Sequence, residues 1–289
     1  MTNILVYILL CIIWGSTWIG IKIGLTDAPP LWSAAFRFIL AVILLIIINA
    51  ITRQKYPKGW RNILRVAWPG LFTYLASYTL TYLGSQYISS AIASILFAVF
   101  PFMTMLLMTV MLKNERISLR SVLGVVVGFS GVVLIFSEPM DYGSNAAFGM
   151  LMMLLSPLAA AFGTVTVRAR LKNEDVFPMV TLQMAVGAIF LTLIAALAED
   201  IALFQVTAKS VGAIVLLAVF GSVMAFTAYY WLLKRLSLIT MSLIALITPI
   251  VAMCLGYFVL DEILTTQDYA GAALVLTGVA VVNLKLKAH

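Results

Sequence analysis

The sequence predicts an all-α membrane protein with ten transmembrane helices, arranged as two inverted five-helix repeats. Composition, a series of long apolar stretches and an internal match between the two halves predict this fold. Of the 289 residues, 63% are hydrophobic and 10% are charged, and the mean hydropathy is +1.11. A soluble protein of this length cannot hide so much apolar surface from water. The lipid bilayer is therefore an expected partner of the chain.

The apolar stretches follow one another with short connections. Each is long enough to cross roughly 30 Å of hydrocarbon as a helix. The first has no basic lead-in and is longer than a signal-peptide core, so it is expected to be retained. Pro101, Pro157 and Pro249 interrupt the fourth, sixth and ninth stretches, where they free backbone carbonyls and permit bends. The predicted spans are 3–25, 31–52, 62–84, 88–112, 118–136, 146–169, 177–198, 209–234, 238–260 and 267–285.

The basic residues lie almost entirely on one side of these spans. Connections after even-numbered spans hold 15 of the 18 Lys and Arg residues, namely Arg53, Lys55, Lys58, Arg61, Arg65, Lys113, Arg116, Arg120, Arg168, Arg170, Lys172, Lys234, Arg235, Lys285 and Lys287. Basic loops stay in the cytoplasm, so both termini and the loop Arg53 to Arg61 are expected inside and Ser137 to Asn145 outside. The expected location is the cytoplasmic (inner) membrane. The net charge of +7 is explained by short basic loops beside apolar spans. We therefore expect no nucleic-acid partner.

The second half of the chain repeats the first. A shift of 148 residues places Gly15 on Gly163, and it also places Tyr82 on Tyr230. Each unit holds five predicted helices, an odd number, so the second unit must enter from the opposite face of the membrane. Inverted repeats of this kind are characteristic of secondary transporters, in which substrate binds near the midplane between the units.

The first half carries a set of short signals, and the second half repeats part of it. The first half has Trp14-Gly15-Ser16, Pro29-Pro30 followed by Arg37, Pro101 followed by Glu115, and Gly124 with Gly131; the second half has Pro249, Glu262, Gly271 and Gly278. In this pattern the chain resembles the EamA-type repeat of the drug/metabolite transporter superfamily, over residues 4–136 and 148–284. The resemblance implies two repeat domains and an exporter or permease. It also implies a central cavity formed by the first, third, fourth, sixth, eighth and ninth helices. The family's substrates range over amino acids, nucleosides, other metabolites and drugs, so the resemblance does not identify the cargo.

Aromatic and hydroxyl side chains are the candidates for a substrate cavity. Tyr78 and Tyr82 share one helical face of the third span, and Tyr230 occupies the equivalent face of the eighth. The first span contributes Trp14, Ser16 and Thr17. Alternatives are interior packing for the rings and hydroxyls bonded to carbonyls of their own helix.

Two cations are candidates for contact with an anionic substrate. Lys22 lies near the outer end of the first span, where snorkelling to water is the alternative. Arg37 lies about two turns inside the second span, where an unpaired guanidinium costs a few kcal/mol. Nearby carbonyls, Gln183 or an anionic substrate can satisfy it, and structural pairing is the favoured interpretation.

Pro101, Glu115, Pro249 and Glu262 are interpreted as structural markers of the repeat. The two carboxylates precede Ser118 and Thr265 by three residues, so tight turns between helices explain them. None of the 11 Asp and Glu residues falls in the middle third of a span, which predicts gradient-following transport without a carboxylate proton relay. The face formed by Gly124 and Gly128 suits close helix packing within the protomer or between protomers, which leaves a homodimer open.

No phosphate-binding loop, metal-ligating cluster or activated nucleophile is present in the sequence, so we expect no enzyme activity, no cofactor and no metal. The expected function is transport of a small-molecule substrate, such as an amino acid or another organic metabolite, by alternating access around a midplane cavity. Alternatives are a carrier of anionic or phosphorylated metabolites and, in a different class, a membrane receptor or scaffold derived from a transporter.

Overall fold

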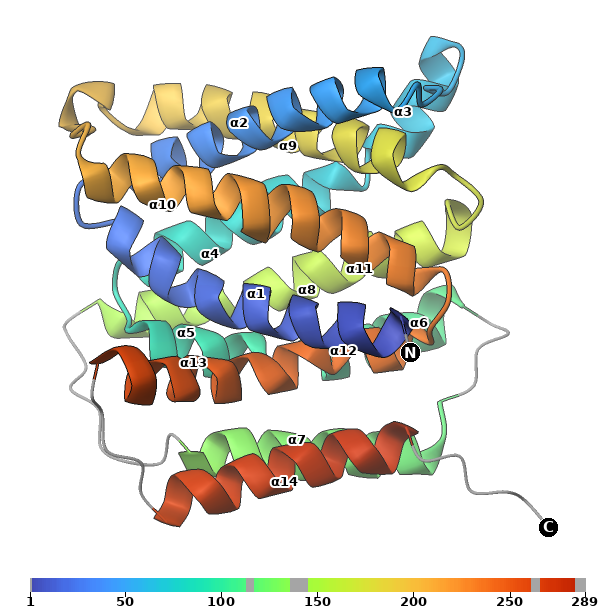
Figure 1. The fold of residues 1–289 in the computed structure, drawn as a ribbon, viewed down its shortest axis with the longest axis vertical. Coiled ribbons are helices and arrows are strands. Elements are labelled where there is room, and N and C mark those ends of the chain that lie inside the picture. The colour runs from blue at the N-terminus through green and yellow to red at the C-terminus, as the bar shows by residue number, and fades with distance from the viewer. Residues whose placement is uncertain (1, 113–116, 136–144, 261–265, 284–289) are drawn as a thin grey trace.

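The computed structural model describes residues 2–112, 117–135, 145–260 and 266–283, which fold into helices joined by short connections (Figure 1). The predicted markers Glu115 and Glu262 and residues 137–144 of the predicted outer loop lie outside these ranges. The helices of the first half are α1 (Thr2–Gly24), α2 (Pro30–Ile51), α3 (Trp60–Ala67), the π-helix η1 (Leu71–Ala76), α4 (Ser77–Ser85), α5 (Ser90–Phe97), α6 (Phe100–Met111) and α7 (Leu119–Ile135). The helices of the second half are α8 (Ala146–Arg170), α9 (Val176–Ala198), the short 3-10 helix η2 (Ile201–Leu203), α10 (Ala208–Ala218), the π-helix η3 (Val219–Met224), α11 (Ala225–Leu233), α12 (Leu238–Ser242), α13 (Ile244–Leu260) and α14 (Thr266–Asn283).

The described residues contain 6 helices that are long and apolar enough to cross a membrane. They are Thr2–Gly24, Pro30–Ile51, Ile92–Met111, Ala146–Arg170, Val176–Ala198 and Ala208–Leu233, and three shorter apolar helices cover Leu119–Leu134, Leu238–Ala252 and Tyr269–Val282. The predicted third span is in neither group; a turn at Trp68 and Pro69 separates α3 from the helical segment formed by η1 and α4. The prediction of a helical membrane protein is confirmed.

The outward faces of the helices are apolar. On α1, Ile4, Ile8 and Ile12 lie on one face with exposed fractions of 66%, 49% and 51%. On α9, Ile189 and Leu193 are exposed in the same way. Apolar surface of this extent is incompatible with water and is the normal surface of a protein in hydrocarbon.

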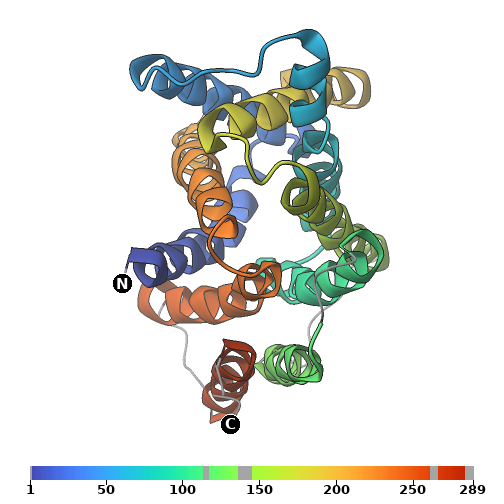
Figure 2. The same cartoon turned by 90° about the vertical axis from the view of Figure 1, so that its right-hand side faces the viewer.

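The helices that correspond in the two halves pack against each other in opposite directions. Near one end of the α2 and α9 pair, the carboxylate of Glu199 accepts the Leu31 N–H at 3.0 Å. Near the other end, Asn49 Nδ2 donates to Thr181 Oγ1 at 2.9 Å. Early residues of α2 therefore meet late residues of α9, so the two helices run antiparallel. In both views α2 and α9 lie at one end of the long axis of the molecule (Figures 1 and 2).

Helices α7 and α14 form the second antiparallel pair, at the opposite end of the long axis (Figure 2). A Cβ atom added at Gly124 would lie 2.7 Å from Gly278 O, and one added at Gly131 would lie 2.5 Å from Gly271 O. Only glycine permits the two backbones to approach this closely. The small-residue face of the fifth predicted span is therefore used for packing within the protomer.

Several local features recur at equivalent positions of the two halves. The π-helices η1 and η3 begin at Leu71 and Val219, which are separated by the 148-residue repeat. Helices α5 and α12 both start at a serine N-cap, in which Ser89 Oγ accepts the Ile92 N–H and Ser237 Oγ accepts the Thr240 N–H. Each π-helix widens one turn and leaves carbonyls out of the usual hydrogen-bond series, often next to a functional site.

The two marker prolines differ in setting. Pro101 lies in the first turn of α6, just after the break that separates α5 from α6. Pro249 lies inside α13, whose preceding break falls earlier, at Leu243. Proline is tolerated in the first turn of a helix, whereas inside a helix it removes one backbone hydrogen bond.

We expect Ser156→Ala to lower the unfolding free energy by about 1 kcal/mol. Ser156 is fully buried in α8, where its Oγ lies 2.9 Å from Ser77 Oγ and 2.7 Å from Thr81 Oγ1. It also donates to Ser77 O at 2.9 Å. The loss would appear as a lower melting temperature of the purified protein in detergent.

Ser130→Ala is the matched control, because the exposed Ser130 hydroxyl donates only to Val127 O of its own helix. We expect a change within about 0.5 kcal/mol for this surface substitution. Equal melting temperatures for both variants would contradict the structural role of Ser156.

Candidate functional site

A cavity of about 100 Å³, measured as the space open to the centre of a water-sized sphere, lies between helices of the two halves. Its walls come from α1, the η1–α4 segment, α5, α6, α8, α11, α12 and α13, with one residue from α2. Apart from α2, these helices belong to the first, third, fourth, sixth, eighth and ninth predicted spans. The space exceeds what a single water molecule requires and is of the kind that holds a small organic ligand.

Aromatic rings form much of the cavity wall. Trp14 packs against Phe226 and Tyr229, with ring centroids 5.4 Å and 5.1 Å away. Trp18 packs against Phe97 with a centroid separation of 5.5 Å. Edge and tilted contacts are favoured arrangements of aromatic rings, so these side chains stabilise one another in an apolar wall.

Hydroxyl groups follow the η1–α4 side of the cavity. Thr73, Ser77 and Thr81 all line it, and the hydroxyls of Thr73 and Tyr229 have no hydrogen-bond partner within the described residues. Sequence reasoning missed this stripe, although its spacing of four residues beside Tyr78 is a recognisable signal. These groups give a largely aromatic wall a small number of polar contacts.

The predicted cavity residues separate into two groups. Trp14, Thr17 and Tyr78 line the cavity. Tyr82 and Tyr230 do not line it, and both are packed in the interior. Tyr230 borders a much smaller space beside Lys234. On α11 the cavity is lined by Phe226 and Tyr229, which are three residues apart, and not by Tyr230, which is four residues after Phe226.

The hydroxyls of the first span use carbonyls of their own helix. Ser16 Oγ donates to Ile13 O at 2.7 Å, and Ser16 does not line the cavity. Thr17 Oγ1 donates to Trp14 O at the same distance, yet Thr17 still borders the space. Both hydroxyls therefore bond to carbonyls of their own helix, which was the alternative to a role in the cavity.

Lys22, a predicted candidate for contact with an anion, is not among the described residues that line the cavity. Its Nζ donates to Ser85 O, at the last residue of α4, at 3.0 Å and to Ile88 O, in the connection between α4 and α5, at 2.9 Å. Carbonyls at and after the end of a helix lack intrahelical partners, so they are available to the amine. Lys22 therefore joins α1 to the α4–α5 connection.

Arg37 is buried, with an exposed fraction of 1%, and it lines the cavity. Its Nε donates to Ser222 Oγ at 2.9 Å and its Nη2 donates to Gly221 O at 3.1 Å, both in the π-helix η3. Its Nη1 donates to Tyr82 OH at 3.4 Å, and its Cζ lies 4.8 Å from the ring centroid of Tyr78. Every one of these partners is uncharged. Structural pairing of Arg37 is thus present, and Gln183 takes no part because its Nε2 donates to Val66 O.

The profile of the EamA-like transporter family matches residues 1–137 and 147–284. The chain belongs to this family. EamA proteins are part of the drug/metabolite transporter superfamily, so the molecule is a membrane transporter.

Relatives of this EamA-family transporter carry general descriptions. It is 28% identical over 272 residues to an "Uncharacterized transporter" of Archaeoglobus fulgidus, covering 94% of this chain and 95% of the relative. It is 27% identical over 284 residues to the "Uncharacterized inner membrane transporter YedA" of Escherichia coli K12, covering 95% of this chain and 88% of the relative. A solved structure described as "Crystal structure of protein" shares the fold, with a TM-score of 0.80 over 98% of this chain and 96% of that chain at 17% identity.

At one end of this EamA-family transporter, connections of the two halves are bonded to each other. Thr207 Oγ1 donates to Asp27 Oδ2 at 2.5 Å, and the Gln205 N–H donates to Asp27 O at 2.9 Å. The hydrogen bond from Thr207 holds the pKa of the Asp27 carboxyl below its usual range. Glu199 accepts the N–H groups of Leu31 and Trp32 at the start of α2. These bonds join the α1–α2 connection to the α9–α10 connection.

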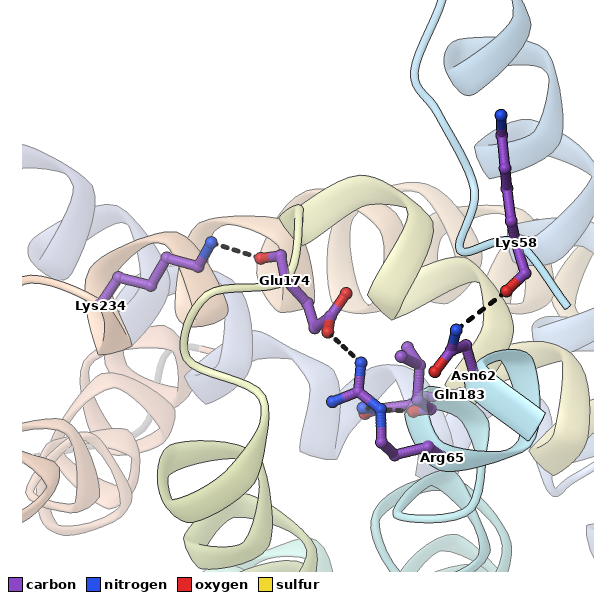
Figure 3. Close-up of polar contacts among 7 residues, drawn as sticks. Lys58, Asn62, Arg65, Glu174, Gln183 and Lys234 are labelled. Atoms are coloured by element: carbon purple, nitrogen blue, oxygen red, sulfur yellow. Dashed lines mark hydrogen bonds and ion pairs between the residues drawn. The ribbon is translucent and has the colours of Figure 1, made fainter.

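Glu174 joins three segments at the other end (Figure 3). Its Oε1 pairs with Arg65 Nη2 of α3 at 2.5 Å, and its backbone carbonyl accepts a hydrogen bond from Lys234 Nζ at the end of α11. Arg65 belongs to the first half of the chain, whereas Glu174 and Lys234 belong to the second. The cavity therefore lies between two ends that each carry polar contacts between the halves.

We expect Glu174→Gln to lower the unfolding free energy by less than about 1 kcal/mol. The side chains of Arg65 and Glu174 are 48% and 24% exposed, so water and salt weaken their attraction. A cycle of Glu174→Gln, Arg65→Gln and the double variant, measured by thermal melting at low and high salt, isolates the pair. A coupling that high salt leaves unchanged would contradict a solvent-screened pair.

Proposed function

We propose that this protein is a carrier of the cytoplasmic membrane that exports small organic metabolites, such as amino acids, by alternating access. Its ten proposed transmembrane helices form two inverted repeats, residues 4–136 and 148–284, and substrate binds between them. The observation that carries this proposal is the aromatic cavity, because both halves of the chain supply its walls. A site between two repeats changes its exposure when one repeat moves against the other.

The antiparallel pairing of corresponding helices supports the inverted arrangement. Helices α2 and α9 correspond under the repeat, and so do α7 and α14, and each pair runs in opposite directions through its contacts. Two copies inserted in the same orientation would have corresponding helices that run parallel. The duplication of the π-helices at equivalent positions is a further support.

The orientation is proposed from the distribution of the basic residues, with both termini in the cytoplasm. Lys58 and Ala202 are exposed positions that this topology assigns to opposite sides. In a background that lacks Cys11 and Cys254, an impermeant thiol reagent should label Ala202→Cys in intact cells and leave Lys58→Cys unlabelled until the cells are opened. Equal labelling of both positions in intact cells would contradict the topology.

Transport itself is tested with purified protein in liposomes. We expect movement of members of a panel of amino acids, nucleosides and aromatic organic compounds, and retention of the same compounds by liposomes without protein. The aromatic cavity favours compounds with a flat apolar part. Absence of flux for the whole panel in both directions would contradict the proposal.

Coupling to protons is not part of the proposal, because none of the described residues that line the cavity is Asp, Glu or His. We expect a transported compound to equilibrate without an imposed pH gradient. Accumulation of a non-ionisable compound against its own gradient, driven by a pH gradient alone, would require a titrating group of the protein and would refute this expectation.

A further inference from the structure

We infer that Arg37 is the anchor for a carboxylate, and that the transported substrates are monocarboxylates with a flat apolar body. The inference rests on the proposed function, because it assigns a substrate class to the same cavity. It starts from the charge of the cavity wall. Arg37 supplies a permanent positive charge, and no acidic residue occurs among the described residues that line the space.

The surroundings of Arg37 stabilise the guanidinium without neutralising it. A carbonyl, two hydroxyls and the face of the Tyr78 ring supply its contacts. Dipoles and a ring offset part of the cost of burying a charge, but the site keeps a net charge of one unit. A monoanion that enters the cavity would remove this excess charge at a place where water does not screen it.

Arg37 also retains hydrogen-bond donors for a ligand. A guanidinium has five N–H groups, of which the hydrogen bonds to Ser222, Tyr82 and Gly221 use three, one on each nitrogen. One N–H remains on each terminal nitrogen, with the Tyr78 hydroxyl beside the guanidinium as a neighbour that a ligand can displace. Two donors on a planar cation match the two oxygens of a carboxylate, which is the arrangement that gives paired hydrogen bonds their strength and specificity.

The rest of the cavity selects the body of the ligand. Trp14, Phe97, Phe100 and Phe226 present rings to the space, and a flat apolar group can pack among them. Phosphate esters carry up to two negative charges near neutral pH. Among the described residues that line the cavity, Arg37 is the only cation, since Lys22 is directed to Ser85 O and Ile88 O. A monocarboxylate matches the charge, whereas a dianion leaves one negative charge unpaired.

The test compares ligands that differ only in charge. Phenylacetate, phenylacetamide and phenyl phosphate are measured for binding to the purified wild-type protein through tryptophan fluorescence, and for flux in liposomes. We expect phenylacetate to bind at least about tenfold more tightly than the amide or the phosphate ester. A wild-type protein that binds phenylacetamide or phenyl phosphate as tightly as phenylacetate overturns the inference, without any variant.

Variants then assign the preference to Arg37. In Arg37→Gln the advantage of phenylacetate over phenylacetamide should fall to within about threefold, whereas Arg37→Lys should retain part of it because the charge remains without the paired donors. Arg61→Gln removes an equal charge from the exposed surface of α3 and should leave the preference unchanged.

Failure of the inference is distinguishable from failure of the proposed function. Flux of the amide, with no preference for the carboxylate, overturns the role of Arg37 and leaves transport in place. A preference that survives in folded Arg37→Gln protein also overturns it. Absence of binding and of flux for all three compounds overturns the inference, whereas the proposed function is contradicted only when the whole panel of amino acids, nucleosides and aromatic organic compounds also shows no flux.

Discussion

Gly70→Ala should remove most of the folded protein from the membrane. A Cβ atom at position 70 would lie 2.1 Å from Gln183 O and 2.7 Å from Gln183 C and Cα. These are backbone atoms of the buried helix α9, so no side-chain rotation can relieve the contact, and α9 would have to move away from the η1 segment. Overpacking of this kind lowers the free energy of unfolding by about 3 kcal/mol or more when the backbone has to move. The loss is measured as abundance of monodisperse protein after extraction and as its melting temperature.

Gly212→Ala is the matched control for this substitution. No atom lies within 4 Å of the position that a Cβ would take at Gly212, which is on the exposed face of α10. Alanine favours helix over glycine by about 0.5–1 kcal/mol, so this variant should be slightly more stable than the wild type. Two changes of the same chemical kind are therefore expected to act in opposite directions. Normal abundance and melting of Gly70→Ala would refute the close contact between α9 and η1.

The second large effect is expected when the cavity is filled. Ala245 of α13 lines the cavity, so Ala245→Cys adds one sulfur to its wall and leaves every aromatic side chain in place. In a background without Cys11 and Cys254, reaction with N-ethylmaleimide should abolish flux, because the adduct occupies the space that substrate needs. A transported compound in excess should slow the reaction.

Ala202→Cys, on the exposed η2 segment, serves as the control for this experiment. Its reaction with the same reagent should leave flux unchanged. Complete modification of Ala245→Cys, verified by mass spectrometry, together with wild-type flux would show that substrate does not pass through this cavity.

The sequence was sufficient to predict a helical membrane protein and the position of most helices. Long apolar stretches form helices because the backbone must satisfy its own hydrogen bonds in hydrocarbon, so length and composition are strong signals. The third predicted span had less support in the sequence, because Arg61 precedes its apolar stretch and Arg65 lies within it. The structure also has a π-helix in this span. An extra residue in a helical turn is a result of packing and leaves no clear mark in the sequence.

For the cavity, the sequence predicted helical faces better than individual contacts. Trp14 and Tyr78 line the space as expected, because their spacing places them on the inner faces of α1 and α4. Tyr82 was assigned to the same space, but its hydroxyl accepts a hydrogen bond from Arg37 in the packed interior. Lys22 was assigned to a ligand, but it is bonded to backbone carbonyls 63 and 66 residues away in the chain. Such distant partners cannot be identified from spacing along one helix.

The pairing of α7 with α14 has a consequence for biosynthesis. The glycine face of α7 leaves the ribosome well before α14, whose contacts Gly271 and Gly278 lie near the other end of the described chain. At 5–20 residues per second, this interval is on the order of 10 s. During that time the glycine face of α7 has no α14 to pack against. The nascent first half therefore presents an unpaired helix face on which another polypeptide can pack in place of α14.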